Sequence, residues 1–145
     1  MPLQDRDTIR WRVHFESPRS VVYRALTTDE GRASFWAERA PASDGSIDFE
    51  FINGVRESSP ILEEDPESRF AIRYFGAEVT FELAEPDDGG TDLTLTTQGF
   101  AREDREEVLA GWLNVLLPFK AAVDHGIDLR NHDRSRTWDD GWVDQ

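Results

Sequence analysis

The fold is decided by residues 103–125, which read EDREEVLAGWLNVLLPFKAAVDH. Apolar residues recur in this stretch at steps of four, three, four and four, which is the period of one helix face. They are Val108, Trp112, Val115, Phe119 and Val123. Acidic residues crowd the first turn, where the helix dipole favours negative charge, and Gly126 follows as a C-terminal cap. The stretch therefore predicts one long helix with a broad apolar face that must be buried.

Two residues disturb this helix. Gly111 costs about 1 kcal/mol relative to alanine in a helix interior. Pro118 cannot donate a hydrogen bond to the carbonyl of Asn114, so we expect a kink there. One interpretation is a bend that follows the curvature of a sheet. The other is that Gly111 and the kink leave room for a ligand beneath Trp112 and Leu116.

The residues upstream of this helix predict a sheet. Alternation of apolar and polar residues indicates six strands, at residues 8–15, 47–51, 55–62, 69–75, 77–83 and 91–98. Asn53-Gly54 is the strongest hairpin signal in the chain, and residues 41–45 are expected to form a loop. Ser17-Pro18 is typical of a helix start, and a second short helix is expected at residues 30–36.

The predicted order is β-α-α-β-β-β-β-β-α. Consecutive strands joined by short turns form an antiparallel meander, and strands segregated from helices indicate an α+β fold. We therefore expect a curved antiparallel six-stranded sheet around the long C-terminal helix, with the first strand at an edge of the sheet.

Length, composition and charge exclude several classes of protein. The chain has 145 residues, which suits one domain, and no cysteine, which excludes disulfides and thiolate chemistry. Thirty acidic residues against 16 basic ones give a net charge of −14, so nucleic acid and anionic membranes are excluded as partners. No apolar run is long enough to span a bilayer and no signal pattern opens the chain, so we expect a cytoplasmic protein without integral membrane association.

Several short motifs resemble those of one known superfamily. A strand that ends at Phe15, then Ser17-Pro18 with the helix through Thr27, then Phe35-Trp36, resembles the opening of SRPBCC, or START-like, domains. Gly111-Trp112 and the leucines after it resemble the final-helix motif of the branch that is similar to the activator of heat-shock protein 90 ATPase. The likeness covers about residues 8 to 125.

The resemblance implies a helix-grip fold, in which a curved sheet grips the C-terminal helix around an internal cavity. Members commonly bind lipids, sterols, polyketides or other apolar molecules, and some are cyclases or hydrolases. We expect residues 1–145 to form a single START-like domain, with 126–145 as a C-terminal extension packed on its surface. Trp138 and Trp142 would make that packing, or else a dimer contact or a cover for the cavity.

The expected cavity lining combines aromatic rings with a few polar groups. Its apolar members are Phe35, Trp36, Phe49, Phe51, Phe81, Trp112 and Leu116. By alternation, Glu57 and Ser59 share the face of Ile61 and point inward, and Tyr74 offers a hydroxyl that could orient a ligand. These three residues are core polar groups, ligand-orienting groups or, in the sharpest interpretation, acid-base catalysts.

The sequence shows no catalytic triad, phosphate-binding loop or metal motif, so we expect no cofactor, no metal and no catalytic residue. His125, Asp128, His132 and Asp133 lie close in sequence, but a metal needs ligands that converge at fixed distances, and a solvated surface is the simpler interpretation.

Three functional hypotheses remain. The first is a binding module for a small apolar molecule or lipid. The second is an enzyme of the cyclase or hydrolase kind that uses Glu57, Ser59 or Tyr74. The third is an interaction protein that stimulates a chaperone ATPase. We favour the binding module, and a homodimer is left open.

Overall fold

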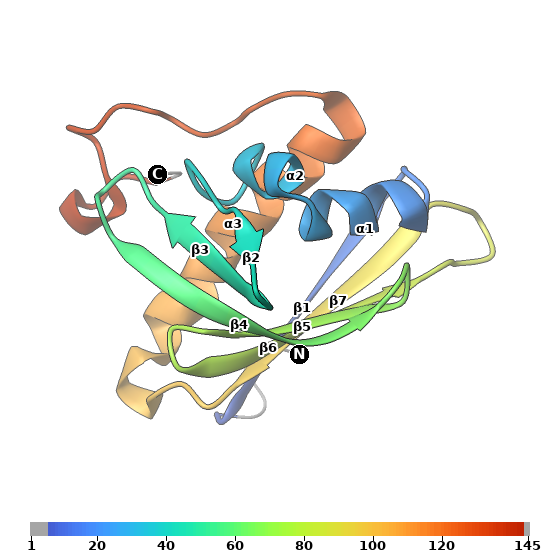
Figure 1. Ribbon diagram of the computed structural model, residues 1–145, viewed down its shortest axis with the longest axis horizontal. Helices are drawn as coiled ribbons and strands as arrows, with labels where there is room; N and C mark the ends of the chain where they lie inside the picture. Colours follow the sequence, from blue (N-terminus) through green and yellow to red (C-terminus); the bar gives the residue numbers. More distant parts are fainter. Residues whose placement is uncertain (1–5, 144–145) are drawn as a thin grey trace.

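The computed structural model describes residues 6–143 and shows a curved antiparallel sheet wrapped around one long helix (Figure 1). The strands are β1 (Thr8–Phe15), β2 (Ala42–Ser43), β3 (Ser46–Glu50), β4 (Arg56–Asp65), β5 (Arg69–Tyr74), β6 (Ala77–Ala84) and β7 (Thr91–Gln98). The helices are α1 (Arg19–Thr27), α2 (Asp29–Ala33) and α3 (Arg105–His125), with short 3-10 turns η1 (Arg102–Asp104) and η2 (Trp138–Asp140). This is the predicted α+β helix-grip architecture.

The sheet has the order β1-β7-β6-β5-β4-β3-β2, and every neighbouring pair is antiparallel. The long meander is confirmed, and so is the edge position of β1, which pairs along β7 from Thr8↔Gln98 to Phe15↔Thr91. The sheet curls around α3, as the right-handed twist of a long antiparallel meander favours (Figure 1).

Within residues 6–143 the sheet has seven strands, one short strand more than the six predicted. Residues 42–43 were expected to lie in a loop, but they pair with β3 through Ala42↔Ile47 and Ser43↔Ser46. Asp44 and Gly45 both have positive φ, at 53° and 77°, as a two-residue hairpin turn requires. A two-residue strand shows no alternation in sequence, so only the Asp-Gly turn pointed to it.

Helix α3 is one continuous element from Arg105 to His125 that passes through Pro118, and the kink at Pro118 stays a prediction. The predicted cap is confirmed: Gly126 has φ 64°, and its N–H donates to the carbonyl of Ala122 at 3.1 Å. No helix within residues 6–143 has both the length and the apolar content needed to cross a membrane.

The C-terminal half of α3 packs into a dense aromatic core. Phe119 stacks on Phe35, with ring centroids 4.1 Å apart, and also contacts Phe15 at 4.8 Å. Val22 and Leu26 from α1 are fully buried in the same cluster. These side chains fill the space between sheet and helix at this end of α3, where α1 and α2 also lie (Figure 1).

A buried arginine holds the two short helices together. Arg32 is 1% exposed and donates hydrogen bonds to the carbonyls of Ala40 at 2.9 Å and Leu26 at 3.1 Å, and to the carboxylate of Asp29 at 2.7 Å. A buried charge is tolerated only when it is paired and hydrogen-bonded in this way.

The chain after Gly126 returns over α2 toward the β3–β4 hairpin (Figure 1). Arg130 donates to the carbonyls of Ala33 at 2.8 Å and Ala37 at 2.9 Å. Farther along, Asp139 accepts a hydrogen bond from the amide of Asn53 at 3.1 Å. These contacts tie the tail to the body at two widely separated places.

Candidate ligand-binding cavity

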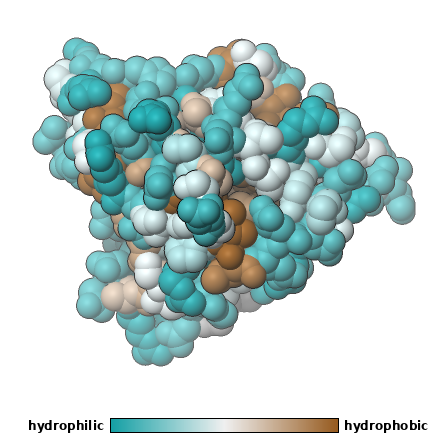
Figure 2. Space-filling model, viewed as in Figure 1, coloured by the Kyte–Doolittle hydropathy of each residue, from teal (hydrophilic) through white to brown (hydrophobic). Residues whose placement is uncertain are grey.

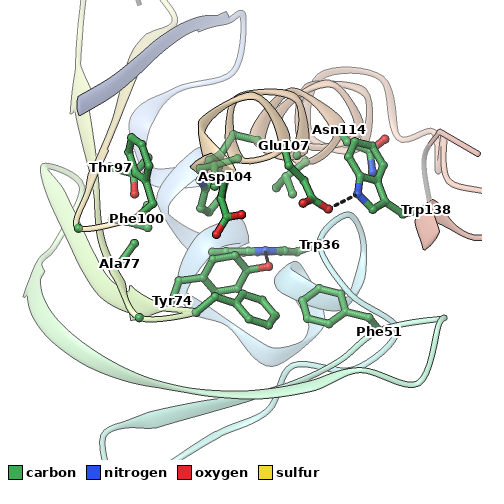
Figure 3. Close-up of a pocket in the computed structure, with 18 of the residues that line it drawn as sticks. Trp36, Phe51, Tyr74, Ala77, Thr97, Phe100, Asp104, Glu107, Asn114 and Trp138 are labelled. Carbon is green, nitrogen blue, oxygen red and sulfur yellow. Dashed lines mark hydrogen bonds between the residues drawn. The ribbon is translucent and has the colours of Figure 1, made fainter. Parts of the chain in front are cut away.

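A cavity of about 580 Å³ lies beneath the N-terminal half of α3. Its floor and walls come from segments far apart in the chain: the residues after α2, the β5–β6 turn, the end of β7, and one face of η1 and α3 (Figure 3). Trp138 of the tail adds a further wall. Several lining residues are exposed, including Phe75 and Asp104, so the cavity opens to solvent at its rim.

Three aromatic rings form the centre of this cavity. The ring centroids of Trp36 and Tyr74 are 5.6 Å apart, those of Trp36 and Trp112 are 5.9 Å apart, and those of Tyr74 and Trp112 are 5.2 Å apart. The indole N–H of Trp36 donates to the hydroxyl of Tyr74 at 3.2 Å. Burial raises the pKa of Tyr74, and the nearby Glu57 carboxylate raises it further against the opposing hydrogen bond from Trp36, so the phenol keeps its proton. We name Trp36, Tyr74 and Trp112 the aromatic cluster.

Gly111 leaves open space in the roof of the cavity. A Cβ atom built at this position would meet no other atom within 4 Å, apart from the neighbours that any helix supplies. The small residue therefore opens room beside Trp112, which favours the second interpretation of Gly111 made from the sequence. The room lies against Trp112 and Val115, whereas Leu116 faces the solid core.

The polar groups of the lining are few and distinct. The hydroxyl of Thr97 is buried in the β7 wall and has no hydrogen-bond partner among the described residues. At the rim, Asp104 and Glu107 project from η1 and α3 (Figure 3). Glu107 accepts a hydrogen bond at 3.3 Å from the indole N–H of Trp138, which holds the tail against the rim.

Five of the predicted site residues lie in this lining, and they are Phe35, Trp36, Phe51, Tyr74 and Trp112. Phe49, Phe81 and Leu116 do not, because each is 1% exposed and packed in the core behind it. Phe49 and Phe81 support Trp36 from behind, with ring centroids at 4.8 and 5.7 Å.

The structure corrects the placement of Glu57 and Ser59, which also lie outside the lining. Both share a sheet face with buried β3 partners, through Phe49↔Glu57 and Ile47↔Ser59, so the alternation was interpreted correctly. Ser59 is 0% exposed within the core, and its hydroxyl has no hydrogen-bond partner in the described part of the chain. Glu57 instead caps the β5–β6 turn, where its carboxylate accepts a 2.7 Å hydrogen bond from the backbone N–H of Phe75.

Sequence reasoning missed most of the residues at the rim. Val108 and Val115 could have been found, since they share the helix face of Trp112, and Gly111 was named from the sequence only as leaving room for a ligand. Phe75 and Phe100 carried a weaker signal, because each is an aromatic residue beside a turn glycine. For Trp138, a cover for the cavity was one of three alternatives, and the sequence could not choose among them because a long connecting segment carries this residue to the rim.

Two of the four histidine and aspartate residues considered as metal ligands, Asp128 and His132, tie the tail to Glu38, and we name this group the clamp. His132 contacts the carboxylates of Asp128 at 2.7 Å and Glu38 at 2.8 Å, and these hydrogen bonds raise its pKa against the effect of partial burial. Within residues 6–143, no three histidine, aspartate or glutamate side chains converge as a metal site would require.

The comparisons with known proteins agree with this architecture. A family model described as "Activator of Hsp90 ATPase homolog 1-like protein" matches residues 16–124. No curated protein sequence matches the chain.

Three solved structures share the fold at low sequence identity. Protein SSP2350 from Staphylococcus saprophyticus is 22% identical, with a TM-score of 0.74 over 85% of this chain and 96% of that one. The Aha1 dimer from Colwellia psychrerythraea is 21% identical, with a TM-score of 0.74 over 82% of this chain and 97% of that one. DynU16, from the dynemicin biosynthetic locus, is 21% identical with a TM-score of 0.76 over 87% of this chain, but this match spans only 50% of DynU16.

Because the family model covers most of the chain and the fold agrees with it, the chain belongs to the family of Activator of Hsp90 ATPase homolog 1-like proteins.

Proposed function

We propose that the protein binds a small hydrophobic molecule or lipid in the cavity beneath the N-terminal half of α3. The observation that carries this proposal is the cavity itself, of about 580 Å³ and walled by the aromatic cluster. Ligand sites in proteins have volumes of about 300–1,000 Å³ and are mostly apolar with a few placed polar groups. The cavity fits this description in size and in lining.

The energetics favour an apolar occupant. Because the cavity opens to solvent, water contacts its apolar lining, and an apolar ligand beside Trp36 and Trp112 would remove that surface from water. Burial of apolar area contributes about 25 cal/mol per Å², so a ligand that buries about 200 Å² would gain about 5 kcal/mol before the cost of association.

Gly111 provides the sharpest test. The Gly111→Phe variant would place a ring in the open space of the roof, and Gly111→Ala adds only one methyl group there. We expect the phenylalanine variant to weaken binding of the neutral apolar dye N-phenyl-1-naphthylamine by about tenfold or more, and the alanine variant to change it by about twofold at most. Dye fluorescence gives the affinity, and thermal unfolding confirms that both variants fold. Equal binding by the phenylalanine variant and the parent would contradict the proposal.

Of the groups once considered for catalysis, only Tyr74 lines the cavity. The enzyme alternative therefore has one buried phenol in the cavity and no partner for it from Glu57 or Ser59.

A second candidate function comes from the family itself, whose description names an activator of the Hsp90 ATPase. The Colwellia relative is an Aha1 dimer, so we also propose that this chain forms a homodimer. A cytoplasmic location stays a prediction from the sequence. ATP turnover by a bacterial Hsp90-type chaperone, measured with and without this protein, tests the first point, and an unchanged rate counts against it. Sedimentation equilibrium tests the second, and a mass of 16.6 kDa at all concentrations counts against the dimer.

A further inference from the structure

The charged side chains of the cavity are all acidic. Asp104 and Glu107 are the ionisable side chains of its rim, and the described lining contains no lysine, arginine or histidine. Figure 3 shows the Asp104 carboxylate pointing from η1 toward the space above Tyr74 and Trp36, and the Glu107 carboxylate, at the start of α3, turned toward Trp138. Negative charge therefore faces the mouth of an otherwise aromatic chamber.

The carboxylate of Asp104 does not cap helix α3. This residue is the last of η1 and precedes α3 with φ −93° and ψ 2°, outside the extended conformation of a capping residue, and its side chain makes no capping hydrogen bond. Within the described residues, no hydrogen bond or ion pair involves this carboxylate. The exposed carboxylate of Asp104 is therefore available to a ligand at the rim of the cavity.

The carboxylate of Glu107 also has an oxygen available to a ligand. One of its oxygens accepts the hydrogen bond from Trp138, which orients the carboxylate and leaves the other oxygen for a second donor. The two carboxylates come from neighbouring turns, so one positively charged group at the rim can approach both.

The aromatic cluster beneath the rim also favours positive charge. Faces of tryptophan and tyrosine rings attract cations through the ring quadrupole, and tryptophan does so most strongly. Trp36, Tyr74 and Trp112 all line the cavity, and Tyr74 stays a neutral phenol because of its burial. The net charge of −14 adds a general field that draws cations to the protein.

An anionic ligand at the helix N-terminus is the opposing possibility. The first turn of α3 attracts anions through its backbone N–H groups, but Glu106 and Glu107 already occupy that turn and Asp104 precedes it. These acids would repel a carboxylate or phosphate at the same place.

We infer that the ligand is an amphipathic organic cation, an apolar body that carries a protonated amine or quaternary ammonium group. Its body lies among Trp36, Tyr74 and Trp112, and its nitrogen lies at the rim between Asp104 and Glu107. The buried hydroxyl of Thr97, which has no partner in the described part of the chain, supplies one further polar contact on the β7 wall. This inference rests on the proposed function and adds the chemical class of the ligand.

The test uses three probes with one naphthalene body and different charge: 1-naphthylmethylammonium, 1-naphthylmethanol and 1-naphthoate. Titration calorimetry on the full chain at low salt gives each affinity. We expect the cation to bind about tenfold more tightly than the alcohol and the carboxylate to bind most weakly, with the preference reduced at high salt.

The matched variants locate the effect. The double variant D104N/E107Q removes both rim charges while it keeps side-chain shape and an acceptor for Trp138. The control D87N/D88N makes the same charge change in the exposed turn between β6 and β7, away from the cavity. We expect the first variant to reduce the preference for the cation to about twofold or less and the control to keep it.

The outcomes separate the inference from the proposed function. Equal affinity for the three probes, or tighter binding of 1-naphthoate, overturns the cationic class and leaves the apolar cavity standing. If D104N/E107Q and D87N/D88N lose the preference for the cation equally, the inference is also overturned, because the net charge of the whole protein would then cause that preference. If neither these probes nor N-phenyl-1-naphthylamine bind, both proposals fail. The comparison of probes on the parent chain needs no variant to fold.

Discussion

The two halves of α3 present the same apolar stripe to very different surroundings. In the C-terminal half, Phe119 stacks on Phe35 with ring centroids 4.1 Å apart, and the space to the sheet is solid. In the N-terminal half, Gly111 faces open space and Val108 lines a cavity of about 580 Å³. Helical periodicity runs unchanged through both halves, so the difference comes from what lies opposite the helix.

The packing elements explain that difference. The solid half lies beside α1 and α2, whose side chains complete the core. The hollow half lies above strand ends, where β5 turns at Phe75-Gly76 and β7 ends before Gly99. Small residues and turns there supply too little volume to fill the space. Figure 2 shows a mostly hydrophilic face of the molecule with a few separate hydrophobic patches. One helix thus supports a stabilising core at one end and a candidate site at the other.

The largest expected effect tests the solid half. Phe119→Ala removes a ring that is 0% exposed and contacts Phe15 and Phe35, so we expect a loss of about 3–5 kcal/mol in the free energy of unfolding. Val108→Ala is the matched truncation in the hollow half and should cost about 1 kcal/mol, since Val108 is only half-buried. Urea unfolding measures both, and equal costs would contradict the distinction between the halves.

The next effect concerns the anchor at the solid end of α3. The Asp124 side chain has no exposed surface and accepts hydrogen bonds from the backbone N–H groups of Glu16 and Ser17, the hydroxyl of Ser17, and Lys120. Burial opposes its ionisation, but these hydrogen bonds prevail and lower the pKa of Asp124 from 3.8 to about 2. We expect Asp124→Asn to cost about 2 kcal/mol at neutral pH.

The same pKa shift fixes the pH dependence of this effect. A lowered pKa in the folded state means that ionised Asp124 stabilises the fold fully above pH 3.8, and that this contribution is lost as the pH falls through about 2. The stability difference between parent and Asp124→Asn should therefore shrink over that range. Urea unfolding at several acidic pH values measures it, and a difference that does not change with pH would count against the anchor.

A smaller effect, of opposite sign, is expected in the hollow half. Gly111→Ala adds helix propensity without a clash, so it should raise the free energy of unfolding by up to about 1 kcal/mol. Gly126→Ala is the matched control. Gly126 has φ 64°, where a side chain is strained, so the change there should destabilise the protein by about 1 kcal/mol. Destabilisation by Gly111→Ala would show that the roof is closed.

The smallest effect concerns the tail that carries Trp138 to the cavity. The hydrogen bonds that His132 donates to the carboxylates of Asp128 and Glu38 raise its pKa, the one to Asp128 more strongly. The protonated clamp therefore stabilises the tail fully below pH 6.5, and this contribution is lost as the pH rises through the raised value. His132 is 45% exposed, so screening limits the effect to less than about 1 kcal/mol. Amide exchange of residues 127–143 should be faster at pH 9 than at pH 6 after correction for intrinsic rates. His132→Asn should remove that change and His125→Asn should not.

Local patterns were sufficient for most of the fold. The spacing of apolar residues by four, three, four and four predicted α3, and alternation predicted the six longer strands. Asn53-Gly54 predicted the β3–β4 hairpin. Chain order then implied an antiparallel meander with β1 at its edge, as the sheet order confirms. These features depend on neighbours in sequence, where propensity and periodicity act.

The candidate site followed from the sequence only in part. Alternation and helical period correctly indicated that Phe49, Ser59, Tyr74, Phe81 and Trp112 face inward, but they could not separate a residue that fills the core from one that lines a cavity. Trp36 and Tyr74 line the hollow, whereas Phe49 behind them is core.

What the sequence determined by itself was the set of elements, their order and the faces they bury. Only the tertiary structure decided where the interior is solid and where it is open, that Asp104 points to the cavity instead of its own helix, and that Trp138 reaches Glu107. The physical reason is that a void depends on the summed volume of side chains from distant segments, and no local pattern records that sum.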